Sequence, residues 1–260
     1  MMRAAVLSIA LALVPGATPA RAQPPPSSSS PAPAALRADR GFVSINGGYR
    51  PASASFTDTV RVTQNVEAGT IDTAYRVKAA PDFDVAGGVR IWRQLAVAVD
   101  VAYFSKASGG TVSAQIPHPF FFGRPRTVEG EAPGLSRREV AVHGQLVWMM
   151  PAGHPRGWRV AVAGGPSFFT LRQQVVQDIT VSEAYPFDTA TLATVVSQRV
   201  EKSRVGFNVG ADLSYMLSPA VGIGTTVMFS RARVPLPTAG HDVIVDAGGA
   251  HVGAGLRFRF

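Results

Sequence analysis

The sequence lacks cysteine entirely and has only three lysines among its 25 basic residues. Without cysteine, neither disulfide bonds nor thiolate metal sites can hold the fold together. Soluble surfaces usually carry lysine and glutamate freely, whereas here arginine takes the place of lysine almost everywhere. The shortage of lysine therefore counts against an ordinary soluble surface.

Long apolar runs and paired metal ligands are also missing. Beyond residue 22 no stretch of eighteen apolar residues occurs, which excludes a helix that spans a membrane. No two of the five histidines have the spacing of metal ligands. We therefore expect no metal site and no cofactor.

The N-terminus has the pattern of a secretory signal peptide over residues 1–22. Arg3 supplies a positive charge, residues 4–14 are largely apolar, and Ala20-Arg21-Ala22 forms an A-x-A cleavage site. The apolar stretch is too short for a membrane anchor, so we expect export. Removing the two arginines of the signal peptide lowers the formal charge from +8 to +6. Such a charge by itself indicates solubility and a loose affinity for anions.

Residues 23–40 have the composition of a flexible linker. Proline, serine and alanine dominate this stretch up to residue 35, and such a composition cannot bury a core. The remaining residues, 41–260, have the length of one domain.

The last ten residues alternate between apolar and polar or small side chains, which predicts a strand with two unlike faces. Seven earlier segments share this pattern. They are Gly41–Tyr49, Phe83–Ile91, Leu95–Tyr103, Glu139–Trp148, Trp158–Phe168, Arg204–Tyr215 and Val221–Phe229.

The connections between these eight segments alternate in length. Every second one is a short turn, and the others are long, covering residues 51–82, 105–137, 171–203 and 232–247. All long connections therefore lie at one end of a meander, which is typical of outer-membrane proteins. We predict an all-β fold: an eight-stranded antiparallel up-and-down transmembrane β-barrel. Its last strand would pair with its first, leaving no open edge.

The alternating pattern leaves open which face meets water, because a soluble barrel would turn its apolar face inward. Two observations favour lipid outside. The polar face is rich in glycine and alanine, which suits the crowded interior of a small barrel. Aromatic residues gather near the ends of the segments, as two membrane interfaces would select. The predicted girdle at the short-turn end comprises Trp92, Trp148, Trp158 and Tyr215.

The architecture of residues 41–260 and the terminal Gly-Leu-Arg-Phe-Arg-Phe resemble the small OmpA/OmpX-like outer-membrane β-barrel family of Gram-negative bacteria. The resemblance implies that Leu256, Phe258 and Phe260 form the signal read by the barrel-assembly machinery. It also implies a location in the bacterial outer membrane, in contact with lipid and lipopolysaccharide, and we expect a monomer. The peptidoglycan-binding module of longer family members is not expected.

Charged residues on the polar face form the first candidate site. We predict that they meet in the lumen, where buried charges must be paired. The predicted set is Asp84, Arg90, Asp100, Glu139, His143, Arg159, Arg204, Asp212, His251, Arg257 and Arg259. One interpretation is a salt-bridge network that fills the lumen. The alternative is a narrow porin-like channel, where the arginines at the lower end would favour anions.

An enzyme that modifies lipid A is a more remote alternative. Such chemistry needs a serine activated by a histidine on the lipid-facing wall. By parity His143 and His251 point inward, and the other three histidines (His118, His154 and His241) lie in connections. No serine neighbours a lipid-facing histidine, so we predict no catalysis.

The long connections give the chain its individuality. The segment from His118 to Arg126 combines three phenylalanines with arginines, and could contact an extracellular ligand or lipopolysaccharide. It could equally be a strand extension that packs on a neighbouring connection. Residues 54–62 and 195–200 also alternate, which predicts strands above the membrane. The arginines form no single patch, so nucleic acid is not an expected partner. We predict a structural or surface-interaction role.

Overall fold

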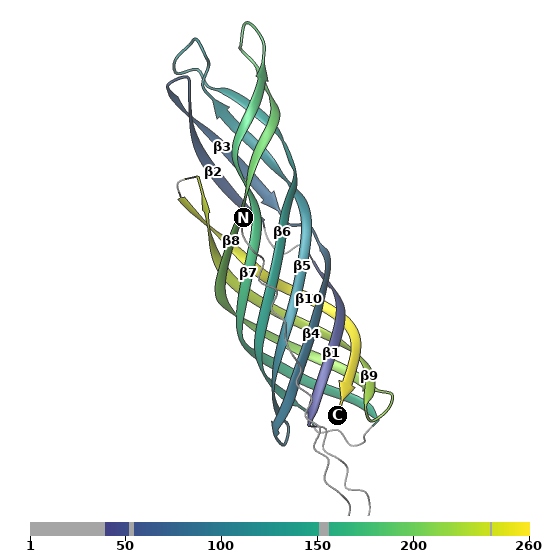
Figure 1. Cartoon of the computed structure of the whole chain (residues 1–260). Coiled ribbons are helices and arrows are strands. Elements are labelled where there is room, and N and C mark those ends of the chain that lie inside the picture. The colour runs from purple at the N-terminus through teal and green to yellow at the C-terminus, as the bar shows by residue number, and fades with distance from the viewer. Residues whose placement is uncertain (1–39, 52–54, 151–155, 240) are drawn as a thin grey trace, which may run out of the picture. The chain divides into compact units, whose positions relative to one another are not determined.

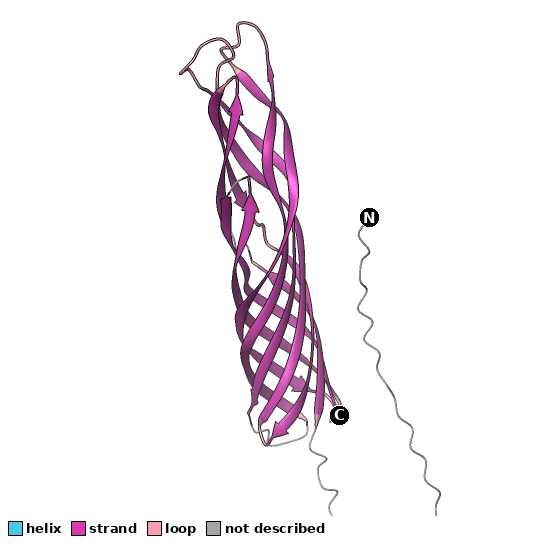
Figure 2. Cartoon of the chain, turned by 60° about the vertical axis from the view of Figure 1, so that its left-hand side comes forward, coloured by secondary structure: helices cyan, strands magenta, loops and turns pink. Residues whose placement is uncertain are grey.

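The computed structural model describes residues 40–51, 55–150, 156–239 and 241–260. The predicted signal peptide and all of the linker except Arg40 lie outside the described residues. The described chain consists of antiparallel strands and their connections (Figure 2). It contains no helix that is long and apolar enough to cross a membrane.

Ten strands follow one another along the chain. They are β1 (Gly41–Arg50), β2 (Ser55–Gln64), β3 (Glu67–Arg76), β4 (Ala80–Trp92), β5 (Leu95–Ile116), β6 (Arg126–Met149), β7 (Gly157–Glu183), β8 (Ala190–Met216), β9 (Val221–Thr238) and β10 (His241–Arg259).

Eight of these strands form a closed ring in the order β1, β4, β5, β6, β7, β8, β9, β10 (Figure 1). The ring closes where β10 pairs with β1, from Phe42 opposite Arg259 to Tyr49 opposite Val252. All eight predicted segments lie in these eight strands, and the predicted pairing of the last with the first is confirmed. Closure matters because an unpaired edge would present free N–H and C=O groups to other chains.

The prediction of long loops is wrong for most of their length. β5 runs for 22 residues and β7 and β8 for 27 each, so these strands extend far beyond the predicted segments. The connection over residues 51–82 contains the hairpin β2–β3. The strand predicted at 195–200 lies within β8, and the one at 54–62 corresponds to β2 from Ser55 onward.

The ring separates into layers at its extended end, which is the end opposite the short turns. Pairing of β8 with β9 stops at Phe207 and Arg231, and pairing of β6 with β7 stops at Arg137 and Gln173. Beyond these points the hairpins β7–β8 and β9–β10 continue, but they no longer pair with each other. The strands β2, β3, β5 and β6 form a sheet there. Figure 1 shows these pieces diverging above the ring.

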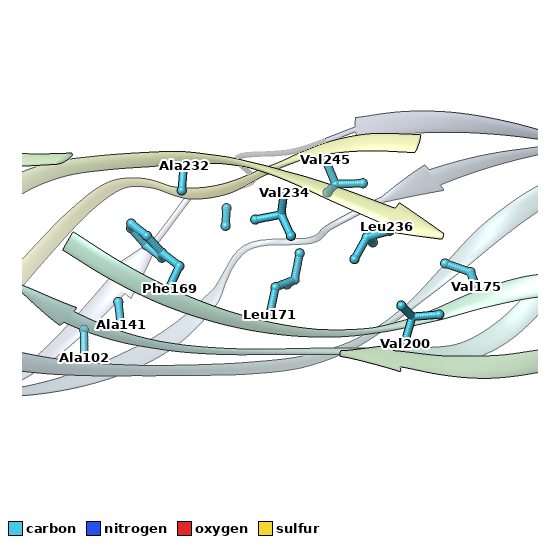
Figure 3. Packing of buried hydrophobic residues seen from close by; sticks show 11 residues of the cluster. Ala102, Ala141, Phe169, Leu171, Val175, Val200, Ala232, Val234, Leu236 and Val245 are labelled. Carbon is cyan, nitrogen blue, oxygen red and sulfur yellow. The ribbon is translucent and has the colours of Figure 1, made fainter. Parts of the chain in front are cut away.

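Two apolar clusters hold the layers together. In the first, Val234 and Leu236 of β9 face Leu171 of β7 across the interior (Figure 3). The second packs the sheet of β2, β3, β5 and β6 against the β7–β8 hairpin. There the backbone N–H of Val176 donates to the Tyr75 hydroxyl at 2.7 Å. Burial raises the pKa of Tyr75 to about 12.

Closure of the ring depends on a close approach at Gly255 in β10. A Cβ at this position would overlap the carbonyl oxygen of Ile45 in β1. Gly47 lies in the same pair of strands, opposite Ala254, and a Cβ there would meet nothing within 4 Å. Substituting alanine at each position therefore distinguishes the steric clash at Gly255 from the general effect of replacing a glycine in a strand.

We predict that Gly255→Ala destabilises the fold by roughly 1–3 kcal/mol, the usual cost of forcing extra volume into a packed site. Gly47→Ala is the matched control and should leave the stability unchanged within about 0.5 kcal/mol. Urea unfolding of the refolded protein in detergent micelles measures both. Equal midpoints for Gly255→Ala and the wild type would contradict the steric account.

Candidate functional site

The polarity of the strands reverses between the ring and the extended end. On β5 the outward side chains from Val97 to Tyr103 are apolar and exposed, while Asp100 is buried inside. Farther along the same strand the outward residues are small or polar, and Val112 and Ile116 are buried inside. The ring is therefore apolar outside and charged inside, and the extended end has the arrangement of a soluble protein.

The other strands of the ring show the same outward apolar face. Leu146, Ile223 and Val252 are each more than half exposed although they are large aliphatic residues. Soluble monomers rarely expose a continuous apolar surface of this kind.

The predicted aromatic girdle lies together at the short-turn end. Its four members are all exposed, with exposed fractions of 66% for Trp92, 45% for Trp148, 67% for Trp158 and 39% for Tyr215. The rings of Trp158 and Tyr215 touch edge to face, with centroids 5.3 Å apart. At the other border of the apolar band, Tyr49, Tyr103 and Phe168 are also exposed and complete a second aromatic row.

Arg257 of β10 is buried inside the ring. Its guanidinium donates from Nε to Asp212 at 2.9 Å and from Nη1 to the side-chain oxygen of Asn46 at 2.5 Å. Asn46 in turn donates to Asp84 at 2.5 Å. Gly224 leaves room for Arg257, because a Cβ there would lie 3.1 Å from its Nε.

Histidines and further carboxylates occupy the middle of the interior. His251 lies 3.8 Å from carboxylate oxygens of both Asp82 and Asp84. His143 shares a 2.7 Å hydrogen bond with the Ser167 hydroxyl. Asp100 is 4% exposed, and its Oδ1 has no hydrogen-bond partner among the described residues. Asp84 and Asp100 adjoin a cavity of about 90 Å³.

Glu139 is the centre of the uppermost part of the interior. It accepts hydrogen bonds from Arg50 and Arg137, both at 2.6 Å, and from the backbone N–H of Gly248 at 3.0 Å. Arg137 also donates to the backbone oxygen of Asp246 at 2.5 Å. The three charged side chains are at most 4% exposed. They join β1, β6 and β10 where the ring begins to separate, and fill its interior there.

The structure thus joins much of the predicted lumen set to residues that sequence reasoning missed: Asn46, Arg50, Asp82 and Arg137. We call all these residues, with Asp84, Asp100, Glu139, His143, Asp212, His251 and Arg257, the interior charge network. Three of the four missed residues lie just beyond the predicted ends of strands. Extending the alternation by two residues would have placed them on the inward face.

The other four predicted lumen residues lie outside this network. Arg90, Arg159 and Arg259 line a second cavity at the short-turn end, and Arg259 also lines the cavity beside Asp84 and Asp100. Arg204 is exposed, so its assignment to the lumen is wrong. The reason is that pairing of β8 with β9 stops at Phe207, which leaves Arg204 beyond the closed part of the ring.

The predicted assembly signal lies on the outward side of β10. Leu256 is 46% and Phe260 75% exposed, and Phe258 is partly buried. The ring of Phe260 lies directly over Gly41, where a side chain would collide with it.

Residues 118–125 lie in the β5–β6 connection at the tip of the extended end and are not a strand extension, while Arg126 begins β6. Phe120, Phe121 and Phe122 are exposed on the β5–β6 connection, and Tyr185 is exposed on the β7–β8 connection. Phe187 contacts both Phe120 and Tyr185, with ring centroids 5.4 and 6.2 Å apart. We call these five residues the aromatic tip: Phe120, Phe121, Phe122, Tyr185 and Phe187.

Buried polar residues fix the aromatic tip from below. His118 is 4% exposed and its Nδ1 accepts from the backbone N–H groups of Phe120 and Phe121, at 3.1 and 3.2 Å. Arg126 donates to Glu183 at 2.5 Å and to the backbone oxygen of Phe187 at 2.8 Å, joining the two connections. The exposed rings are thus held on a preformed support.

No group of three or more metal-ligating side chains occurs within the described ranges. One row of three strands does bring an acid, a histidine and a serine together. Asp100 pairs with His143, and His143 with Ser167. All three are at most 4% exposed, and Asn208 also donates to the Ser167 hydroxyl, at 2.9 Å. The neighbouring 90 Å³ cavity is lined by Asp100 but not by His143 or Ser167.

No family model and no curated protein matches the chain. Solved structures do resemble it. Outer membrane protein OprG of Pseudomonas aeruginosa has a TM-score of 0.48 at 12% identity, over 86% of this chain and 98% of that one. Neisserial surface protein A has 0.41 at 10%, over 85% and 97%. The outer membrane protease OmpT of Escherichia coli has 0.42 at 10%, over 87% and 100%. Likeness at this level assigns neither family nor function.

We predict that Glu139→Gln destabilises the fold by about 3–5 kcal/mol, because it removes the carboxylate shared by two buried guanidinium groups and leaves Arg50 only Asp82, 4.0 Å away. Glu201→Gln removes one partner of the exposed pair with Arg172 and is the control. The control should cost less than about 0.5 kcal/mol. Urea midpoints in micelles measure both variants. Similar midpoints for the two would show that Glu139 does not hold the interior together.

Proposed function

We propose that this chain is an outer-membrane β-barrel protein whose ring of eight strands spans the lipid bilayer. The observation that carries the proposal is the reversal of polarity along β5. Lipid accounts for the exposed apolar residues from Val97 to Tyr103, and water accounts for the polar exterior beyond them. The N-terminal signal peptide would export the chain, and the strand ending at Phe260 would direct its assembly.

The dimensions of the apolar band fit this proposal. Within the ring, β1 has 10 residues and β4 has 13, and a tilted strand crosses a bilayer with about 9–11 residues. Aromatic residues border the band on both sides, with the tryptophans at the short-turn end. The short-turn end would face the periplasm and the extended end the outside of the cell.

The interior charge network supports a closed barrel over a channel. Arg50, Glu139 and Arg137 contact one another across the interior and are almost fully buried. Ions that passed this level would have to break hydrogen bonds of 2.6 Å between charged groups, which are among the strongest in proteins. The described contacts thus favour a structural role for the lumen over porin-like conduction.

A catalytic role has little support. Asp100, His143 and Ser167 have residue types suited to acyl transfer, but all three are buried inside the ring. Hydrolysis of lipid A would need the serine on the outer wall, where the acyl chain lies. We therefore propose a non-enzymatic protein in which this row belongs to the interior packing.

The aromatic tip is the part best suited to an external partner. Phe122 and Tyr185 are 77% and 86% exposed, and Arg124 lies over the ring of Phe121 with its Cζ 5.4 Å from the centroid. Exposed aromatic residues beside arginine are enriched at binding hot spots. We propose that the extended end acts as a rigid stalk, which presents the tip to a partner with apolar and anionic groups.

We predict that the refolded protein passes no steady current in planar lipid bilayers. Heat-modifiable migration on a gel identifies the folded barrel and is the control for each preparation. No current is expected because the interior charge network fills the lumen. Steady single-channel openings from heat-modifiable protein would contradict the closed barrel and favour the channel.

The tip is tested with producing cells that carry Phe120→Ser, Phe122→Ser and Tyr185→Ser together. Their adhesion to cultured epithelial cells and to matrix proteins should fall at least fivefold, because the loss of aromatic anchors at a hot spot weakens binding strongly. Ile244→Ser removes an exposed apolar residue of the β9–β10 hairpin and should change nothing. Wild-type adhesion that persists in the triple variant, at equal surface levels, would refute a role for the tip.

A further inference from the structure

We propose that the short-turn end of the ring contains a binding site for a phosphate group. The site is a cavity of about 140 Å³ lined by Arg90, Arg93, Arg159 and Arg259, together with Gln94 and Met149. The placement of the site at the periplasmic face rests on the proposed function. Its chemistry rests on the side chains alone.

The charge in this cavity has one sign. Four guanidinium groups adjoin it, and no carboxylate is among its described lining residues. In the neighbouring cavity farther inside, Asp212 is engaged by Arg257. Several positive charges in a cavity with low-dielectric walls produce a strong positive potential, which attracts anions.

Arg90 and Arg93 carry the proposal, because Arg159 and Arg259 already have interaction partners. The Nε of Arg90 is buried and has no hydrogen-bond partner among the described residues. Its Nη2 reaches only the sulfur of Met149, at 3.7 Å, and a thioether is a weak acceptor. A buried donor of this kind gains most from an acceptor supplied by a ligand.

Arg93 supplies a second guanidinium from the turn between β4 and β5. It is exposed, and its Cζ lies 5.3 Å from the centre of the Trp92 ring. Gln94 on the same turn adds an uncharged amide donor. The site thus combines one half-buried and one exposed arginine with the neutral amide donor of Gln94.

The ligand class follows from this donor set. Guanidinium groups bind phosphate oxygens through paired N–H donors, which chloride cannot match. A water molecule occupies about 30 Å³ in the liquid, so the cavity has room for a phosphate group. The exposed Trp92 and Trp158 border this end, where aromatic belts lie at headgroup depth. The phosphate could therefore be a free periplasmic anion or the headgroup of an inner-leaflet phospholipid.

The test titrates inorganic phosphate by calorimetry into the heat-modifiable protein, held at low salt in micelles of a detergent that has no phosphate group. Arg90→Gln and Arg93→Gln should each weaken phosphate binding at least tenfold. Arg172→Gln, on the exposed face of β7 and paired with Glu201, should bind like the wild type. Arg93→Gln keeps the test valid if the more buried Arg90→Gln fails to refold.

A second arm distinguishes the two sources of phosphate. Native mass spectrometry counts phosphatidylglycerol retained by protein taken from mixed nanodiscs. Retention that falls in both variants, with competition by inorganic phosphate, would identify a lipid headgroup as the ligand. Phosphate binding without lipid retention would identify the free anion.

Two results would overturn the site. One is phosphate affinity and lipid retention that are the same in both variants as in the wild type. The other is equal affinity for chloride and phosphate. Neither result bears on the barrel proposal. That proposal fails instead if the wild type has no heat-modifiable form.

Discussion

The hydrogen-bonded pairing of β10 with β1 is the constraint on which the rest of the structure depends. It turns an open sheet into a ring, which leaves no unpaired edge and separates an inward face from an outward one. The pairing needs close contact between backbones, which Gly255 permits opposite Asn46. Once the ring is closed, inward side chains must satisfy one another, because neighbouring strands cannot move apart to admit bulk water.

The interior charge network follows from that requirement. Arg257, Asn46 and Asp84 form one chain of hydrogen bonds, and Arg50, Glu139 and Arg137 form another. The first links β10, β1 and β4, which are neighbours in the ring, and the second links β1 and β6, which lie across the interior from each other. The second chain lies where the ring gives way to separate hairpins, so it braces the level at which backbone pairing ends. Polar contacts there replace the lost ladder bonds.

The eight strands of the ring could be predicted because alternation is a local property of the sequence. The extended end was harder, since the apolar face of β5 changes from outward at Tyr103 to inward at Val112. When the apolar residues of one strand move from its outward to its inward face, the alternation in the sequence appears to end there. Arg204 shows another limit: its alternation is regular, and only the point at which β8 leaves β9 decides its exposure. The aromatic tip and the arginine cavity likewise depend on contacts between distant strands.

Closure between the ends of the chain also has a kinetic consequence. Phe42 and Arg259 pair directly although nearly the whole described chain lies between them. Contacts at such separation form slowly, because the entropy of a long loop is lost before the contact gives any stabilisation. The ring cannot close before β10 is available to pair with β1, even if the strands between them have already paired. Its assembly should therefore be a late, all-or-none event, timed by the arrival of the final strand.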